Sequence, residues 1–271
     1  KKFYISKDDF LSLKEEAEKH NIILFSSMLS EDWVDFLSQH TQILKIASGD
    51  LTFKPLIEAV AKTGKKTIMS TGSSTLKEIE EAIQWFKENS IYENDINKQL
   101  TLMHCVSSYP TPIEQANIKS IPFLKEKFNL NVGYSNHVIG MNASLAAVAL
   151  GARVIELHFT DQKHDREFRD HSLSFEFEEI LRFKESAINI IKSLGKFNKM
   201  VMDVEKDNLK LIRKGLIASK DLDINHEITE DDIAYARPAK YFSSNEKSLI
   251  LGKKTKTIIK KGFVFKDDNL K

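Results

Sequence analysis

Two histidines at the ends of consecutive apolar runs have the residue type and placement that metal chemistry needs. His137 follows the run at residues 131–135, and His158 lies at the end of the run at residues 154–159. Short apolar runs bounded by polar residues predict buried strands, and neighbouring strands lie about 4.8 Å apart. Two imidazoles at adjacent strand ends can bind one divalent metal and leave positions for water and substrate. Hydrogen bonding near the rim of the sheet is an equally open role for either histidine.

Two carboxylates accompany the histidines. Glu156 precedes His158 by two residues, so both side chains point to the same side of a strand. There Glu156 can assist a metal-bound water or orient a ligand, and an ion pair with a lysine of the sheet is its alternative role. Asp170 belongs to a polar loop, residues 161–171, after the last apolar run. It can contact a sugar hydroxyl or act as a base, unless the loop is merely solvated.

One lysine and several hydroxyl side chains lie at or just after the ends of the apolar runs. They are Lys45, Ser48, Ser70, Thr71, Ser107 and Ser135. A lysine among hydroxyls suits a ligand that carries both a phosphate and a carboxylate. Gly49 and Gly72 either allow close backbone approach or form turns. Cys105, the single cysteine, is expected to be a small core residue.

Strand-like runs alternate with amphipathic helical segments from residue 8 to about residue 195. Strands are expected at 22–27, 43–48, 67–70, 100–105, 131–135 and 154–159, and helices at 8–19, 32–39, 55–63, 76–86, 120–129, 141–150 and 174–194. Thr75 and Glu78 form a capping-box pattern, and Gly195 can end the last helix. The alternation predicts an α/β fold with a parallel sheet covered by helices. Polar residues after nearly every strand favour a (β/α)₈ TIM barrel over an open sheet, because these ends converge on one mouth in a barrel.

Composition restricts the class of protein further. The 271 residues include 40 basic and 39 acidic ones, so nucleic acid is not an expected partner. No apolar run approaches the roughly 20 residues of a membrane helix, and no signal peptide is recognised. These features and the single cysteine favour a cytoplasmic location. Residues 1–198 are expected to form the catalytic domain, 199–212 a charged linker, and 213–271 a small β-rich domain.

Six motifs in series resemble the sialic acid synthase family, which includes N-acetylneuraminate, legionaminate and pseudaminate synthases. They are KIASGD at 45–50, STG at 70–72, HCVSSYPTP at 104–112, GYSNH at 133–137, ELHFT at 156–160 and DH at 170–171. The tail resembles the SAF (antifreeze-like) domain of that family, through RKGLIAS at 213–219, TEDD at 229–232, RP at 237–238 and Gly252.

The resemblance implies condensation of phosphoenolpyruvate with an N-acylmannosamine-type amino sugar and water, which yields a nine-carbon sialic-type acid and phosphate. It implies a divalent metal, usually Mn²⁺ with Mg²⁺ or Co²⁺ as alternatives, held by His137 and His158. The same histidines, Glu156 and Asp170 would be catalytic. Phosphoenolpyruvate would contact Lys45, Ser48, Ser70, Ser107 and Ser135, and the sugar would contact Tyr109, Asp170 and Arg237. Arg237 would enter the barrel of a second subunit, which requires a domain-swapped homodimer.

The chain departs from the family pattern in three places. Ser107 stands where members often have asparagine, and Phe168 lies where they have glycine. The family barrel has eight strands, whereas six runs are present here in a chain that begins at Lys1 without methionine. We therefore expect the first two strands, with a catalytic glutamate and a lysine, to be missing and this chain alone to be inactive and poorly stable.

Two other functions fit parts of the pattern. Another phosphoenolpyruvate-dependent synthase of the aldolase type would need an extra cationic pocket for a sugar phosphate, and the SAF-like tail argues against it. A non-catalytic sugar-binding protein would show sugar affinity without metal dependence or phosphate release.

Overall fold

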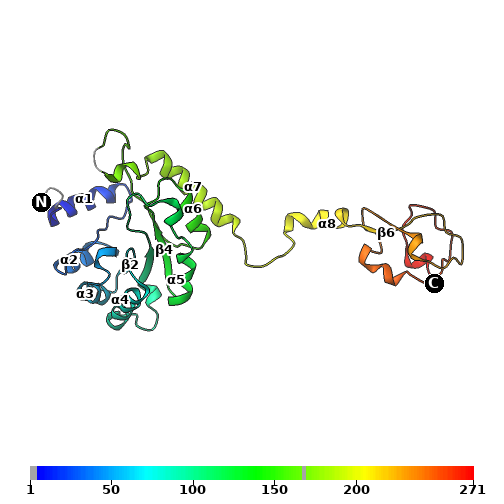
Figure 1. Cartoon of the computed structure of the whole chain (residues 1–271), viewed down its shortest axis with the longest axis horizontal. Helices are drawn as coiled ribbons and strands as arrows, with labels where there is room; N and C mark the ends of the chain where they lie inside the picture. The colour runs from blue at the N-terminus through cyan, green and yellow to red at the C-terminus, as the bar shows by residue number, and fades with distance from the viewer. Residues whose placement is uncertain (1–4, 167–168) are drawn as a thin grey trace. The chain divides into compact units, whose positions relative to one another are not determined.

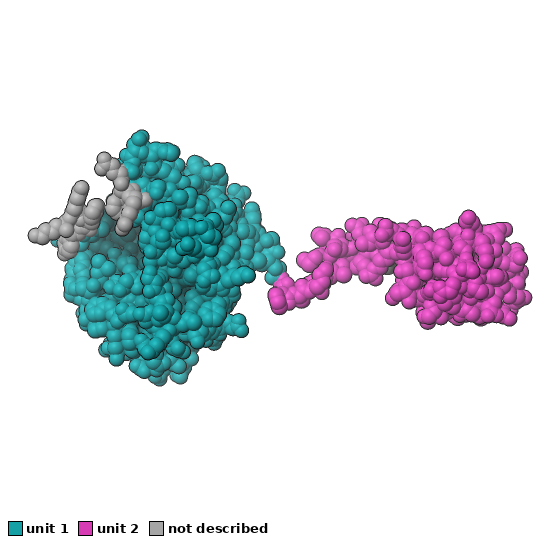
Figure 2. Space-filling view, in the orientation of Figure 1, with its two compact units in different colours: residues 1–195 teal, residues 196–271 magenta. Residues whose placement is uncertain are grey.

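A computed structural model describes residues 5–166 and 169–271 of the chain. It divides into two compact units, Lys1–Gly195 and Lys196–Lys271 (Figure 2). Within the described residues, no helix combines the length and apolar character that crossing a membrane requires.

The first unit is built on one parallel sheet, with strands in chain order (Figure 1). The strands are β1 (Ile43–Ile46), β2 (Lys66–Ser70), β3 (Leu100–His104), β4 (Asn131–Ser135) and β5 (Ile155–Glu156). The helices are α1 (Lys7–Lys19), α2 (Asp32–His40), α3 (Lys54–Lys62), α4 (Leu76–Asn89), α5 (Ser120–Phe128), α6 (Asn142–Ala149) and α7 (Phe177–Ser193). Parallel neighbours need crossover connections, and α3, α4, α5 and α6 supply them between successive strands. The predicted parallel sheet with helices is confirmed, and the sheet curls as part of a barrel does.

The core lies between this sheet and its helices. Leu44, Met69, Leu102 and Val132 are fully buried and contribute one side chain from each of β1 to β4. Each such burial stabilises the fold by about 1.5–3 kcal/mol. Helix α4 begins as predicted, since the Thr75 hydroxyl accepts from the backbone N–H of Glu78 and the Glu78 carboxylate accepts from that of Thr75. Helix α7 ends before Gly195, which has a φ of 59°.

Two strand predictions were wrong in extent. Residues 22–26 form no strand, and only Ser27 makes an isolated parallel bridge, to Lys45. Ile22 and Ile23 are 62% and 59% exposed, so the apolar run lacks the two-sided burial that a central parallel strand requires. Strand β5 stops at Glu156, and beyond it Phe159 bridges Phe175.

The second unit is small and rich in turns. Strand β6 (Gly215–Ala218) pairs antiparallel with β7 (Ile233–Ala236) around a core that includes Leu216, Ile259 and Phe265. The C-terminal runs at 255–259 and 263–265 make only isolated bridges. The segment predicted as a linker contains a helix, α8 (Lys206–Ile212), because its spacing of Leu209 and Ile212 has helical periodicity.

A buried carboxylate fixes the turn between β6 and β7. Asp232 is fully buried, and its Oδ2 accepts hydrogen bonds from the backbone N–H and the hydroxyl of Thr229, each at 2.8 Å. His226 Nε2 lies 2.8 Å from the same oxygen, and Lys220 Nζ lies 2.8 Å from Oδ1. Burial opposes ionisation, but the bonds from Lys220, His226 and Thr229 outweigh it and hold the pKa of Asp232 well below its usual range.

Replacing this carboxylate should weaken the second unit. Asp232→Asn is expected to cost about 1–3 kcal/mol at neutral pH, because buried donors lose an acceptor. The difference in the free energy of unfolding between wild type and Asp232→Asn should shrink as the pH falls below about 4. In that range Asp232 binds a proton in the unfolded state but stays ionised in the folded state. Urea unfolding followed by NMR signals of β6 and β7 amides measures both effects. Asp231→Asn, at an exposed neighbour, is the control and should change stability by less than about 0.5 kcal/mol.

Candidate active site

A cavity of about 520 Å³ opens at the carboxyl ends of the parallel strands. The predicted site residues that line it are Lys45, Ser48, Ser70, Ser107, Tyr109, Ser135, His137 and Glu156. Because all strands of the sheet run parallel, their carboxyl ends lie on one side, and residues far apart in sequence meet there.

An ion pair crosses this cavity. Lys45 comes from β1 and Glu156 from β5, which lie at opposite edges of the sheet. Lys45 Nζ lies 3.4 Å from Glu156 Oε2, and the Ser135 hydroxyl donates to Glu156 Oε1 at 2.9 Å. The ion pair that the sequence left open for Glu156 is therefore present. The Lys45 side chain is only 14% exposed, so its charge acts within the cavity wall.

The two predicted metal-binding histidines lie together. The ring centroids of His137 and His158 are 5.4 Å apart, and the ring of Tyr109 lies 4.1 Å from His137 and 5.9 Å from His158. His137 Nδ1 lies 2.6 Å from the carbonyl oxygen of Val106. A carbonyl only accepts, so Nδ1 carries the proton and Nε2 keeps its lone pair.

This pair has the donor set of an open metal site. Burial lowers the pKa of His137, so its ring is neutral at neutral pH, as a metal ligand must be. Imidazole nitrogens bind divalent transition metals, and two of them leave most coordination positions for water and substrate. In the part of the chain that the structure describes, no group of three or more His, Cys, Asp or Glu side chains is arranged around a metal position.

The hydroxyls predicted at the site differ in whether they are already hydrogen-bonded within the protein. Ser70 Oγ is buried in the cavity wall and has no hydrogen-bond partner among the residues that the structure describes. A buried hydroxyl without a partner costs stability unless a ligand or water satisfies it. The Thr71 hydroxyl instead donates to the carbonyl of Met103 at 2.9 Å, so it supports β3 rather than the cavity.

Gly72 is the point where three polar side chains converge. A Cβ at this position would lie 2.4 Å from Ser107 Oγ and 2.9 Å from both Ser48 Oγ and Cys105 Sγ. The space beside Gly72 is thus filled by the polar wall of the cavity. Gly49, by contrast, has no atom within 4 Å of its hypothetical Cβ. Of the two glycines, only Gly72 is required for close approach.

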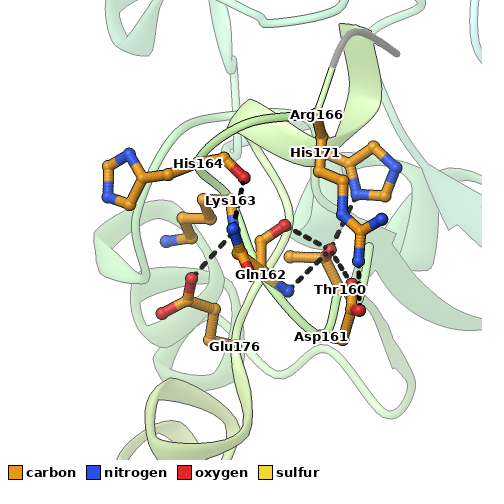
Figure 3. Close-up of polar contacts among 8 residues, drawn as sticks. All are labelled: Thr160, Asp161, Gln162, Lys163, His164, Arg166, His171 and Glu176. Carbon is orange, nitrogen blue, oxygen red and sulfur yellow. Dashed lines mark hydrogen bonds and ion pairs between the residues drawn. The ribbon is translucent and has the colours of Figure 1, made fainter.

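Backbone hydrogen bonds join the two ends of the polar loop after β5. Thr160 N–H donates to the carbonyl of Phe175 at 2.9 Å, and Phe175 N–H donates to that of His158 at 2.7 Å. Thr160 Oγ1 lies 2.7 Å from His171 Nδ1, and Arg166 pairs with Asp161 (Figure 3).

A second set of contacts fastens the same loop to the start of α7. Lys163 N–H donates to Glu176 at 2.9 Å (Figure 3). The Lys163 ammonium pairs with Glu179 at 2.5 Å. Asp170, predicted as catalytic, lies on the returning arm of the loop, where its carbonyl accepts from the Ser174 hydroxyl at 2.6 Å. Burial lowers the pKa of His137, and the Asp170 carboxylate is one of the groups that oppose this shift. Phe168 lies outside the described residues.

Sequence reasoning missed several residues of the cavity wall. Thr52, Ser73, Ser74 and Glu78 also line it. A signal was present for Ser73 and Ser74, because they lie in the loop that follows β2, where barrel proteins carry binding groups. Glu78 belongs to the first turn of α4, and its capping role did not mark it as a cavity residue. Arg237, predicted to contact the sugar, belongs to the second unit, where its Nε donates to the carbonyl of Ile212 at 2.5 Å.

The fold and the site define a parallel α/β protein with a polar, lysine-containing cavity beside a histidine pair. Models of known families identify it further: the NeuB family matches residues 1–199, and the SAF domain matches residues 213–271. The chain belongs to the NeuB family and carries a SAF domain, which confirms the resemblance to sialic acid synthases.

Individual relatives agree with this membership. The chain is 42% identical over 260 residues to uncharacterized protein MJ1065 of Methanocaldococcus jannaschii, covering 94% of this chain and 74% of that protein. It is 38% identical over 239 residues to an N,N'-diacetyllegionaminic acid synthase of Campylobacter jejuni, covering 88% and 70%. The crystal structure of an N-acetylneuraminic acid synthetase from Leptospira borgpetersenii in complex with citrate matches with a TM-score of 0.69 at 34% identity, covering 76% and 70%.

A methyl group at Gly72 should disrupt the cavity wall. Gly72→Ala is expected to destabilise the first unit by about 1–3 kcal/mol, because Ser48, Cys105 and Ser107 must move apart. Gly49→Ala is the matched control on the same cavity and should change stability by less than about 0.5 kcal/mol. Urea unfolding followed by the fluorescence of Trp33 and Trp85 measures both variants. Equal effects of the two substitutions would contradict the close packing described for Gly72.

Proposed function

We propose that this chain carries the active-site cavity of a synthase that condenses phosphoenolpyruvate with an N-acylated amino sugar. The products are a nine-carbon sialic-type acid and phosphate. Membership of the NeuB family and the synthases among its relatives support this assignment. The observation that carries it is the cavity itself, in which the Lys45–Glu156 pair and the unpartnered Ser70 hydroxyl adjoin the two histidines.

Phosphoenolpyruvate suits the hydroxyl-lined side of the cavity. Its phosphate and carboxylate need hydrogen-bond donors and a compensating cation. Lys45 supplies the cation, and the hydroxyls of Ser48, Ser70 and Ser107 supply donors. The Ser135 hydroxyl would join them once the ligand displaces its hydrogen bond to Glu156. These groups are held in place before the ligand arrives, so they offset developing charge at little reorganisation cost.

The reaction balances with water as the only other reactant. C3 of phosphoenolpyruvate attacks the aldehyde carbon of the open-chain sugar, and the aldehyde oxygen takes up a proton to become a hydroxyl. Water adds to C2 and loses one proton, which leaves a hydroxyl on the tetrahedral carbon. Phosphate then leaves, and the hydroxyl loses its proton to become the ketone. In this proposal Asp170 and Glu156 would take and return these protons.

A divalent cation, with Mn²⁺ as first choice, would polarise the sugar aldehyde as a Lewis acid. His137 and His158 would hold it, with the Nε2 lone pair of His137 as one ligand. The hydrogen bond from His137 Nδ1 to Val106 fixes the tautomer that this role needs. Tyr109 and Asp170 would contact the sugar beside the metal.

The sugar side of the site would be completed by a second copy of the chain. In this proposal Arg237 enters the cavity of the partner in a domain-swapped homodimer and contacts the N-acyl group. The expected location of the enzyme is the cytoplasm, where phosphoenolpyruvate is produced.

Phosphate release tests the reaction directly. The complete gene product is incubated with phosphoenolpyruvate and a panel of N-acyl hexosamines, free and phosphorylated. Release should require an N-acyl amino sugar, and Lys45→Met should lower kcat/KM by about a hundredfold or more, since it removes the cation of the anion site. Release with phosphorylated sugars alone would favour an aldolase-type synthase. Sugar binding without release would favour a non-catalytic sugar-binding protein.

Metal removal tests the histidine pair. Chelation should abolish phosphate release, and Mn²⁺ should restore it. His137→Ala and His158→Ala should each weaken Mn²⁺ binding about tenfold or more, as measured by calorimetry in the absence of substrates. His164→Ala is the control, because His164 is an exposed histidine of the neighbouring loop. Unchanged Mn²⁺ affinity in both site variants would refute the metal assignment.

A further inference from the structure

One thiol, one hydroxyl and one backbone amide meet in the wall of the cavity. Cys105 Sγ lies 3.2 Å from Ser48 Oγ, and the Gly72 N–H donates to the same oxygen at 3.0 Å. Cys105 is 5% exposed and is the only cysteine of the chain. All three residues line the cavity.

The number of protons and lone pairs decides how these groups are connected. The Ser48 oxygen has two lone pairs and one proton, and the Gly72 amide occupies one lone pair. The contact with Cys105 uses either the second lone pair, with S–H as donor, or the hydroxyl proton, with sulfur as acceptor. Sulfur is a weak acceptor, whereas a hydroxyl oxygen is a good one. Burial also raises the pKa of the Cys105 thiol, so the thiol keeps its proton at neutral pH.

We propose that Cys105 is a positioning residue for phosphoenolpyruvate: its S–H donates to Ser48 Oγ and, with the Gly72 amide, directs the Ser48 hydroxyl proton into the cavity. With both lone pairs occupied, the hydroxyl proton is left for a ligand oxygen. It can donate to a phosphate or carboxylate without first breaking another hydrogen bond, which is the advantage of a preorganised site. The identity of the anion rests on the proposed function.

The packing around Gly72 keeps this arrangement in place. A Cβ at residue 72 would lie 2.9 Å from both Cys105 Sγ and Ser48 Oγ, so the two side chains fill the space beside the glycine backbone. Neither group can shift toward Gly72 to find another partner. The thiol therefore acts through Ser48 and not as a nucleophile.

Infrared spectroscopy tests the hydrogen bond without any ligand. The difference spectrum between wild type and Cys105→Ser isolates the S–H stretching band of Cys105. In Ser48→Ala this band should move to higher frequency, because the thiol loses its acceptor. A band that stays in place shows that the S–H does not donate to Ser48 and overturns the proposal, whether or not the enzyme turns over.

A double-mutant cycle tests the consequence for binding. Cys105→Ala should weaken phosphoenolpyruvate binding about three- to tenfold, the worth of one neutral hydrogen bond, and leave the KM for the sugar unchanged. Cys105→Ser retains a donor and should recover most of the affinity. In a Ser48→Ala background, Cys105→Ala should have no further effect. A full further loss there would show that Cys105 contacts the ligand itself and would refute the positioning role.

Calorimetric titration measures the binding of phosphoenolpyruvate without the sugar, so its result does not depend on whether the reaction proceeds. Coupling between Cys105 and Ser48 in binding, with no phosphate release for any sugar, would contradict the proposed reaction and support the positioning role. Phosphate release with additive effects of the two substitutions would support the reaction and overturn the positioning role. A general packing defect in Cys105→Ala would weaken sugar and phosphoenolpyruvate binding alike, and Cys105→Ser would then not restore the latter selectively.

Discussion

The contact between Lys45 and Glu156 is the constraint on which the site depends. These residues belong to the first and last strands of the sheet, four strand spacings apart. In a flat sheet, four spacings of about 4.8 Å would separate the two strands by about 19 Å. The observed separation of 3.4 Å between the charged atoms is possible only because the sheet curls and brings its edges toward each other. Ser135 reaches Glu156 without this curl, because the two residues are register partners on the adjacent strands β4 and β5. The curl makes one cavity out of the separate strand ends.

This pair also illustrates why a charge is tolerable in the cavity wall. Removing a lysine ammonium from water costs several kcal/mol unless a partner offsets it. Glu156 offsets that cost while remaining one-third exposed, and the Ser135 hydroxyl satisfies its second oxygen. An incoming dianion can therefore replace part of the interaction of Lys45 with Glu156. The site combines a stable resting arrangement with an available cation.

Local features of the fold were predictable from sequence, whereas features that depend on distant partners were not. The capping box at Thr75 and the αL glycine at residue 195 are short-range, and both were confirmed. The run at 22–26 has strand-like composition, but strand formation depends on neighbours that no local pattern encodes. For the site, strand-end positions predicted which residues would gather. They did not predict that Thr71 turns away to Met103, or that Ser48, Gly72 and Cys105 interlock, because these depend on packing between β1, β2 and β3.

The loop after β5 is held at both of its ends. Its ends are tied by the Phe159–Phe175 bridge and by the bonds from Thr160, while Lys163 holds the outgoing arm to α7. Substitutions at the exposed His164 and Asp165 can therefore be accommodated without displacing the arm that carries Asp170. The loop can vary in sequence at these positions while its two ends stay joined to each other and to α7.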